Sequence, residues 1–272
     1  MRRSLVKALV FLGGGRITAA LIAGLRRARY RNPIIVHDRH PERLRQLKRD
    51  YSVITDPHLH HAVDSAGLLV IAVRPDSVEE LLDQVGTIER PLTVISLAAG
   101  IPLAKLSGKL GTAVRWARAM PSPAARSGRG LTATTFPRKS PKQVRAEVNA
   151  LFHTVGQVIE LPEIRYDVFT VTYSCSHGYH ALATLAAAAE KAGLDRKTAL
   201  LAAAHALGDG VVSWRDGIIS LSELLMEAAT PGGIAATTMT AMNEAGYARS
   251  VERGIRAGLA RTKKNAHLLK SD

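Results

Sequence analysis

The 272-residue sequence contains very little cysteine. Cys175 is the only one, so the chain cannot form an internal disulfide, and this favours a reducing compartment such as the cytoplasm. Its histidine, cysteine and acidic residues show no spacing typical of metal ligands. No uninterrupted apolar stretch is long enough to span a bilayer. We therefore expect a cytoplasmic protein that has no metal and does not enter a membrane.

Acidic residues are also in short supply, and aromatic residues make up only 4% of the chain. There are 37 Lys and Arg residues against 23 Asp and Glu residues, which gives a formal net charge of +14. Such a charge attracts anions, nucleic acid first among them. The basic residues are spread over the whole chain, however, without a repeated motif or interleaved aromatics. An anionic cofactor and substrate explain the charge as well, and nucleic acid is not the expected partner.

A glycine turn near the N-terminus provides the strongest local pattern. Five apolar residues, Ala8 to Leu12, run directly into three glycines, and apolar residues then recur at helical spacing. A tight turn from a strand into a helix aims free N–H groups and the positive end of the helix dipole at one point, which suits a pyrophosphate. Gly13 would make the turn and Gly15 would let the phosphates approach. Thr18 stands where the G-x-G-x-x-G/A pattern has its third small residue, and a plain strand–helix connection is the alternative.

An acidic residue follows the second apolar run, at Ile34 to Val36. Asp38 comes 25 residues after Gly13, near the spacing of the acid that binds the adenosine ribose in dinucleotide sites. Asp38 favours NAD, whereas the basic residues Arg39, His40 and Arg43 beside it favour the 2′-phosphate of NADP. We predict NADP, with NAD as the alternative.

Strand-like and helix-like segments alternate from residue 8 to about residue 161. This alternation predicts an α/β fold with a Rossmann-type, doubly wound, mostly parallel sheet. Small-residue turns at Gly13–Gly15, Ala72–Pro75 and Ala98–Gly100 each follow a strand, and ligands bind at such strand ends. Residues 113–120 form a strand that carries two arginines, so we expect it near an edge of the sheet.

The sequence changes character near Pro162, after which every predicted element is a helix. We predict a dinucleotide-binding domain over 1–163 and an all-α dimerisation and substrate domain over 164–272. Alanine-lined helices make a shallow core, and we expect them to bury a face against a second copy of the chain. The basic run Arg261–Lys264 is expected to be a solvated tail.

Five motifs occur in the order found in the pyrroline-5-carboxylate reductase family, which the chain resembles over almost its full length. They are Gly13-Gly14-Gly15-Arg16-Ile17; Ala72-Val73-Arg74-Pro75; Ala98-Ala99-Gly100-Ile101; Arg118-Ala119-Met120-Pro121 with Gly128, Gly130, Leu131, Thr132 and Ala133; and Thr230-Pro231-Gly232-Gly233. The resemblance implies a Rossmann-type domain, a helical dimerisation domain, a homodimer or larger assembly, and reduction of 1-pyrroline-5-carboxylate to L-proline with NAD(P)H. The cofactor-binding residues it implies, together with those of the glycine turn, are Gly13, Gly15, Arg16, Ile17, Thr18, Asp38, Arg39, Ala72, Val73, Arg74, Pro75, Ala99, Gly100 and Met120.

Candidate substrate residues lie in the second half of the chain. The cofactor supplies the hydride, and a protonated imine accepts it without a strong catalytic acid. A Gly-Gly turn that opens a helix offers N–H donors to a substrate carboxylate, so Thr230, Gly232 and Gly233 are candidates for that role. Ser176 and His177 are candidates for contact with the imine ring, and we name Ser176 and Thr230 as catalytic. A structural histidine and a simple helix–helix turn are the alternatives.

The chain departs from the family pattern around these candidates. The family's S-G-S-G-P-A-Y stretch corresponds to Tyr173–Tyr179, where both glycines and the proline are absent. The two threonines after P-G-G correspond to Ile234 and Ala235. Two further hypotheses follow: reduction of a different imine, or a catalytically impaired dimeric paralogue that binds nucleotide.

Overall fold

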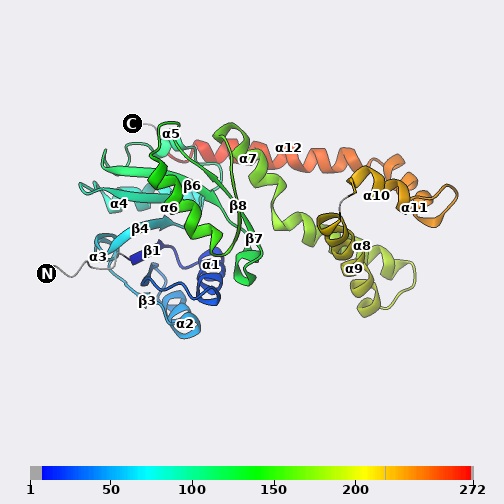
Figure 1. Ribbon diagram of the computed structural model, residues 1–272, viewed down its shortest axis with the longest axis horizontal. Helices are drawn as coiled ribbons and strands as arrows, with labels where there is room; N and C mark the ends of the chain where they lie inside the picture. The colour runs from blue at the N-terminus through cyan, green and yellow to red at the C-terminus, as the bar shows by residue number, and fades with distance from the viewer. Residues whose placement is uncertain (1–7, 218, 271–272) are drawn as a thin grey trace. The chain divides into compact units, whose positions relative to one another are not determined.

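The computed structural model describes residues 8–217 and 219–270 (Figure 1). Their contacts group them into two compact units. The first contains the chain up to Val171 and returns at Gly258, and the second runs from Thr172 to Ala257.

An eight-stranded sheet forms the centre of the first unit, in the order β3-β2-β1-β4-β5-β6-β7-β8. All neighbouring strands are parallel except β6 and β7, which are antiparallel. The chain moves outward from β1 in both directions, so the predicted doubly wound, mostly parallel sheet is confirmed. The strands are β1 (Ala8–Leu12), β2 (Ile34–His37), β3 (Ile54–Thr55), β4 (Ala66–Ile71), β5 (Leu92–Ser96), β6 (Val114–Met120), β7 (Gly130–Thr135) and β8 (Gly156–Glu160).

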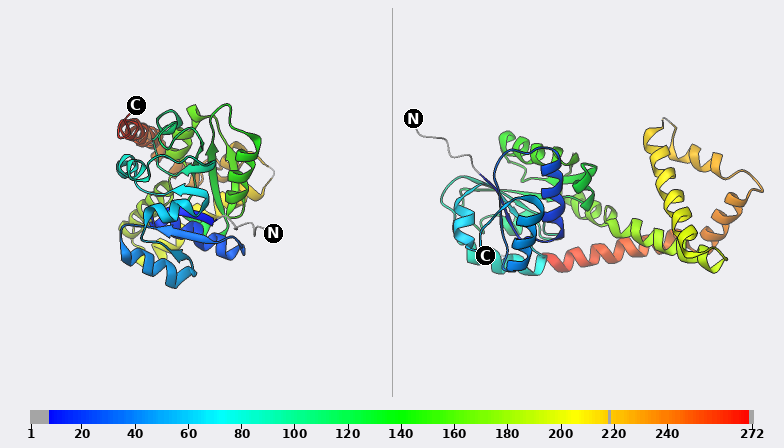
Figure 2. Two further views of the ribbon diagram at one scale, coloured as in Figure 1. Left: turned by 90° about the vertical axis from the view of Figure 1, so that its left-hand side faces the viewer. Right: turned by 90° about the horizontal axis from the view of Figure 1, so that it is seen from below.

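Helices cover both faces of this sheet (Figures 1 and 2). Successive residues of β4 point to opposite faces: Leu69 and Ile71 join one hydrophobic core, and Leu68 and Val70 join the other. A strand buried on both faces reads as a continuous apolar run, which is why the sequence locates it. One face is covered by α1 (Arg16–Arg27), α2 (Pro41–Tyr51), the 3₁₀ turn η2 (Pro123–Ser127) and α6 (Lys142–His153), and the other by α3 (Leu59–Asp64), α4 (Val78–Val85), which follows the 3₁₀ turn η1 (Pro75–Ser77), and α5 (Leu103–Leu106).

Strand β6 lies between β5 and β7, so the expectation of an edge position was wrong. Its Arg118 is only 1% exposed. The guanidinium of Arg118 lies 3.0 Å from both Glu163 Oε1 and Asp167 Oδ1 on α7 (Glu163–Thr172). The guanidinium carbon also lies 4.3 Å from the centroid of the Tyr166 ring, and burial raises the pKa of the Tyr166 hydroxyl. An interior strand can hold this charge because α7 supplies two carboxylates.

The last helix, α12 (Tyr247–Ala266), returns to the first unit at its C-terminal end. It includes the run Arg261–Lys264, which is therefore not a solvated tail. Thr262 and Asn265 are buried, and Asn265 Nδ2 donates to the Ala99 carbonyl oxygen at 3.1 Å. Leu269 is completely buried in the core around α4 and α5. Thr262 and Asn265 lie three residues apart, on one face of the helix, whereas Lys263 and Lys264 between them are exposed.

The second unit consists of helices in the residues that the structure describes. They are α8 (Cys175–Lys191), α9 (Arg196–Asp216), α10 (Leu221–Ala228), α11 (Ile234–Glu244) and the first part of α12. The predicted N-cap Ser220 is confirmed and forms a capping box with Glu223. Few side chains of this unit are buried, and Leu201, Val212 and Leu225 are about half exposed.

Contacts divide the chain differently from the predicted division between residues 163 and 164. Helix α7, up to Val171, and the residues from Gly258 onward belong with the sheet, because Arg118 and the core around α5 hold them there. Whether 1–163 and 164–272 are domains that fold separately stays a prediction. None of the helices described here has both the length and the hydropathy needed to cross a bilayer.

Candidate cofactor site

The predicted glycine turn connects β1 to α1. Gly13 has φ +110°, and a Cβ there would lie 2.8 Å from the Ala72 carbonyl oxygen, so only glycine fits. Its N–H donates to the His37 carbonyl oxygen at 2.8 Å. At Gly15, by contrast, a Cβ would meet nothing within 4 Å. The turn is therefore packed against β2 and the end of β4, while its last residue faces open space.

Helix α1 begins with unpaired N–H groups that suit an anion. Gly15 is its N-cap, makes no side-chain cap bond, and is followed by a first turn without an acidic residue. The first N–H groups of a helix have no partner inside the helix, and they carry the positive end of its dipole. This end of α1 can therefore bind a phosphate.

Asp38 is engaged by the protein itself. Its Oδ2 accepts the N–H of Gly14 at 2.7 Å and its Oδ1 accepts the N–H of His40 at 2.8 Å. The Arg43 guanidinium lies 3.4 Å from Oδ2, and Asp38 is only 8% exposed. The carboxylate that was expected to favour NAD is thus already bonded to two backbone N–H groups and to Arg43, and fewer of its lone pairs are free for a ribose hydroxyl.

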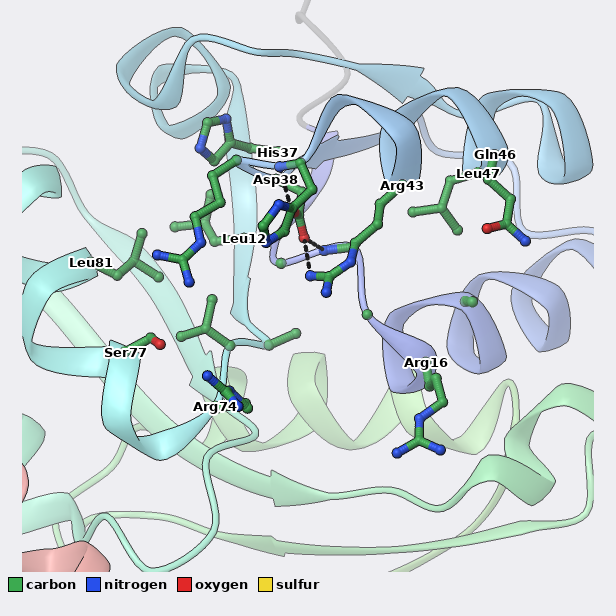
Figure 3. Close-up of a pocket in the computed structure, with 18 of the residues that line it drawn as sticks. Leu12, Arg16, His37, Asp38, Arg43, Gln46, Leu47, Arg74, Ser77 and Leu81 are labelled. Atoms are coloured by element: carbon green, nitrogen blue, oxygen red, sulfur yellow. Dashed lines mark hydrogen bonds and ion pairs between the residues drawn. The ribbon is translucent and has the colours of Figure 1, made fainter.

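A pocket of about 870 Å³ opens where β1, β2 and β4 end (Figure 3). Figure 3 shows Arg43 extending to Asp38, whereas Arg16 and Arg74 lie toward the other side of the pocket. Arginines outnumber the carboxylates of Asp38, Asp50 and Glu80 in the lining, so the pocket carries a net positive charge that attracts an anionic ligand. One guanidinium can bind two phosphate oxygens at once. Five arginines line the pocket: Arg16, Arg39, Arg43, Arg74 and Arg126.

Eight of the predicted cofactor residues line this pocket: Gly13, Gly15, Arg16, Asp38, Arg39, Ala72, Val73 and Arg74. Sequence reasoning missed Arg126, which the structure brings there on η2. This turn packs against α1, and a Cβ on Gly24 would lie 2.1 Å from the Ala125 carbonyl oxygen. The contact is between segments about a hundred residues apart, and no local spacing indicates it.

The other six predicted cofactor residues do not line the pocket: Ile17, Thr18, Pro75, Ala99, Gly100 and Met120. Thr18 is fully buried behind the turn. Ala99 and Gly100 contact α12, where a Cβ on Gly100 would lie 2.6 Å from the Thr262 carbonyl oxygen. Pro75 begins η1, and Met120 ends β6. Their part in cofactor binding stays a prediction.

The candidate substrate residues belong to the second unit. Gly232 has φ +76°, and Gly233 is the N-cap of α11, without a side-chain cap bond. The Gly233 N–H donates to the Thr230 carbonyl oxygen at 2.9 Å, which closes a turn in front of α11. His177 lies in the first turn of α8, and the Ser176 side chain is outside the described part of the chain. The proximity of these residues to the cofactor stays a prediction.

Metal ligation finds no support in residues 8–217 and 219–270. Their His, Cys, Asp and Glu side chains form no group of three or more that could hold an ion.

The sheet, the glycine turn and the basic pocket at the point where strand order reverses define a dinucleotide-binding protein of the Rossmann type. Residues 8–100 match the family model "NADP oxidoreductase coenzyme F420-dependent", and residues 163–265 match "Pyrroline-5-carboxylate reductase dimerisation". The chain belongs to the pyrroline-5-carboxylate reductase family, as its resemblance predicted.

Curated relatives of that name cover most of the chain. The one from Mycobacterium tuberculosis (strain H37Rv) is 28% identical, over 93% of this chain and 95% of its own. The one from Thermus thermophilus is 33% identical, over 73% of this chain and 76% of its own.

Solved structures share the fold. The 1-pyrroline-5-carboxylate reductase from Streptococcus pyogenes has a TM-score of 0.87 at 21% identity, with 96% of this chain and all of that chain covered. The pyrroline carboxylate reductase from Plasmodium falciparum, solved with NADP bound, has a TM-score of 0.84 at 20% identity, with 95% and 98% covered.

Proposed function

We propose that the protein reduces 1-pyrroline-5-carboxylate to L-proline with NADPH, as an oxidoreductase that acts on a CH–NH bond. The curated relatives with that name, which span nearly the whole chain, support the reaction. The observation that carries the proposal is the pocket of about 870 Å³ at the glycine turn, with its five arginines. This pocket has the position, size and charge that a phosphorylated dinucleotide needs.

The residues of the pocket fit NADP. Free N–H groups at the start of α1, next to Gly15, would hold the pyrophosphate. Arg39 and Arg43 would hold the 2′-phosphate beside the engaged carboxylate of Asp38. The nicotinamide supplies the hydride when the cofactor is bound. The protein's own contribution is to orient the two reactants and keep them in contact.

The substrate would be held by the second unit. The turn at Thr230, Gly232 and Gly233 precedes an uncapped helix of 11 residues, which can offer N–H donors to a carboxylate. Ser176 and His177 would contact the imine ring or its nitrogen. The half-exposed apolar side chains of α9 and α10 support assembly with a second copy of the chain. A single cysteine is in keeping with action in the cytoplasm.

The proposal is tested by following NADPH absorbance with the purified protein and 1-pyrroline-5-carboxylate. We expect saturable turnover of about 1 to 1000 per second, the usual enzymatic range. NADPH binding without turnover of this substrate would contradict the proposed reaction while leaving the cofactor site standing.

Ile234 favours a second candidate, a reductase for a different imine. This residue is 89% exposed at the first position of α11, where the family pattern has a threonine. An apolar side chain there suits a substrate without the carboxylate contact that a hydroxyl provides. Faster turnover of an uncharged cyclic imine than of 1-pyrroline-5-carboxylate would support it. NADPH binding without turnover of either imine would indicate a catalytically impaired paralogue.

A further inference from the structure

One peptide group in the glycine turn is held at both of its polar ends by side chains. The carbonyl of Gly13 and the N–H of Gly14 belong to the same peptide plane. The Thr18 hydroxyl donates to the Gly13 oxygen at 2.6 Å, and the Gly14 N–H donates to Asp38 Oδ2 at 2.7 Å. Thr18 is fully buried, and Asp38 is 8% exposed. Two side chains, from α1 and from the end of β2, therefore clamp this plane.

The two hydrogen bonds restrict a peptide plane that would otherwise rotate easily, because glycine flanks it on both sides. Glycine reaches conformations that other residues avoid, so the peptide between two glycines can rotate at low cost. If this plane rotated by half a turn, the Gly13 oxygen would leave Thr18 and point at the Asp38 carboxylate, where the Gly14 N–H now points. The two oxygens would repel each other, so the turn would have to move and the N–H groups that follow it would no longer be aimed at a phosphate.

The hydrogen bond of Thr18 reaches further back along the chain than that of an ordinary helical threonine. A threonine inside a helix usually donates to the carbonyl three or four residues before it. Here Gly15 is the N-cap and makes no side-chain bond, and the Thr18 hydroxyl instead donates to a carbonyl that precedes the helix. Thr18 also stands where the dinucleotide-binding pattern has a glycine or alanine, which cannot make this bond. The bond is thus a property of this chain.

We propose that Thr18 is a positioning residue for the cofactor, a role that rests on the proposed NADPH site. Its hydroxyl fixes the Gly13–Gly14 peptide so that the N–H groups that follow point at the pyrophosphate. Thr18 acts through the backbone and does not touch the cofactor, in keeping with its absence from the pocket lining.

The test compares two ligands and a matched pair of variants. NADPH reaches both the turn and the arginines near Asp38, whereas adenosine 2′-monophosphate contains the 2′-phosphate and lacks the pyrophosphate. Thr18→Val removes the hydroxyl and keeps the shape of the side chain, and Thr18→Ser keeps the hydroxyl. Thr134→Val is the control, because Thr134 is also fully buried and donates to Asn149 Oδ1 at 2.9 Å outside the pocket. Affinities are measured by fluorescence titration or, for the weaker ligand, by competition.

We expect Thr18→Val to weaken NADPH binding about tenfold, the effect of one buried hydrogen bond, and to change adenosine 2′-monophosphate binding by less than about twofold. Thr18→Ser should restore NADPH affinity, and Thr134→Val should leave both affinities unchanged. If Thr18→Val does not fold, Thr18→Ala provides the same comparison.

Equal weakening of both ligands, or no weakening of NADPH, would overturn the assignment of Thr18. If the wild-type protein bound neither ligand, the proposed cofactor site would be wrong instead, so the two failures are distinct.

Discussion

At the scale of single residues, we expect the side chains around Asp38 to discriminate between the two nicotinamide cofactors. The carboxylate already accepts two backbone N–H groups and lies 3.4 Å from Arg43. Arg39 lines the same pocket and makes no ion pair within the described chain. Arg39 is thus the cation best placed to gain from a 2′-phosphate, because it loses no existing partner when the phosphate binds.

Replacing Arg39 by alanine should therefore remove much of the preference for NADPH. We expect Arg39→Ala to raise KM for NADPH about tenfold, the worth of one charge-assisted contact, and KM for NADH by less than about twofold. Arg45→Ala is the control, since Arg45 is an exposed residue of α2 that pairs with Glu42 outside the pocket. Steady-state kinetics with both cofactors measure the effect. An equal rise for NADPH and NADH would show that Arg39 does not contact the 2′-phosphate.

Between elements, α1 and η2 approach each other closely, and residues of both line the pocket. Gly24 permits this approach, since a Cβ there would lie only 2.1 Å from the Ala125 carbonyl oxygen. The next residue on η2, Arg126, lines the pocket. Because Gly24 has no side chain, η2 can pack against α1, and Arg126, about a hundred residues later in the sequence, reaches the pocket.

Gly24→Ala should lower the free energy of unfolding although alanine is the better helix former. The helix gains up to about 1 kcal/mol from alanine, but the clash forces η2 away and costs more, so we expect a net loss of about 1–2 kcal/mol. Denaturant unfolding measures this, with the exposed Arg27→Ala on the same helix as a control expected to stay within about 0.5 kcal/mol. A gain in stability for Gly24→Ala would contradict the observed packing.

The elements themselves could mostly be predicted, and their partners could not. Continuous apolar runs such as β4 show the buried strands, and capping residues such as Ser220 show where helices begin. Arg118 was misleading because its charge suggests an edge, whereas α7 neutralises it from a distant part of the chain. The basic end of α12 was misleading for the same reason, since its few buried residues face a core built much earlier in the sequence.

In the candidate site, the sequence predicts those residues that belong to one short, continuous stretch of chain. The glycine turn and the acid after β2 are patterns within one strand–helix–strand unit, and both lie at the pocket. Arg126 depends on tertiary packing, and the hydrogen bond of Thr18 depends on the backbone geometry of Gly13, so neither has a signal in spacing.

On the scale of the whole molecule, the second unit leaves its apolar side chains exposed. Leu201 is 58% exposed and Leu225 is 46% exposed, and the dimerisation model of the family covers this region. A monomer rarely keeps such surface in water, so these helices are expected to be covered in an assembly.

A charge at this surface should prevent assembly and spare cofactor binding. We expect Leu225→Glu to weaken self-association about a hundredfold, because the carboxylate would lose its water in the interface. NADPH affinity should persist, since every residue that lines the pocket lies in the first unit. Analytical ultracentrifugation measures the mass, with Ile54→Glu as a control that alters a side chain 55% exposed on β3. An unchanged mass for Leu225→Glu would exclude α10 from the interface.

The burial of Leu269 beside α4 also has a consequence for how the chain is made in the cell. During translation the ribosome releases the strands and their covering helices first, and the segment that seals one side of them emerges only after Thr172–Ala257 has been synthesised. Until Leu269 has been synthesised, the apolar side chains that it covers stay exposed in the nascent chain, where chaperones can bind them.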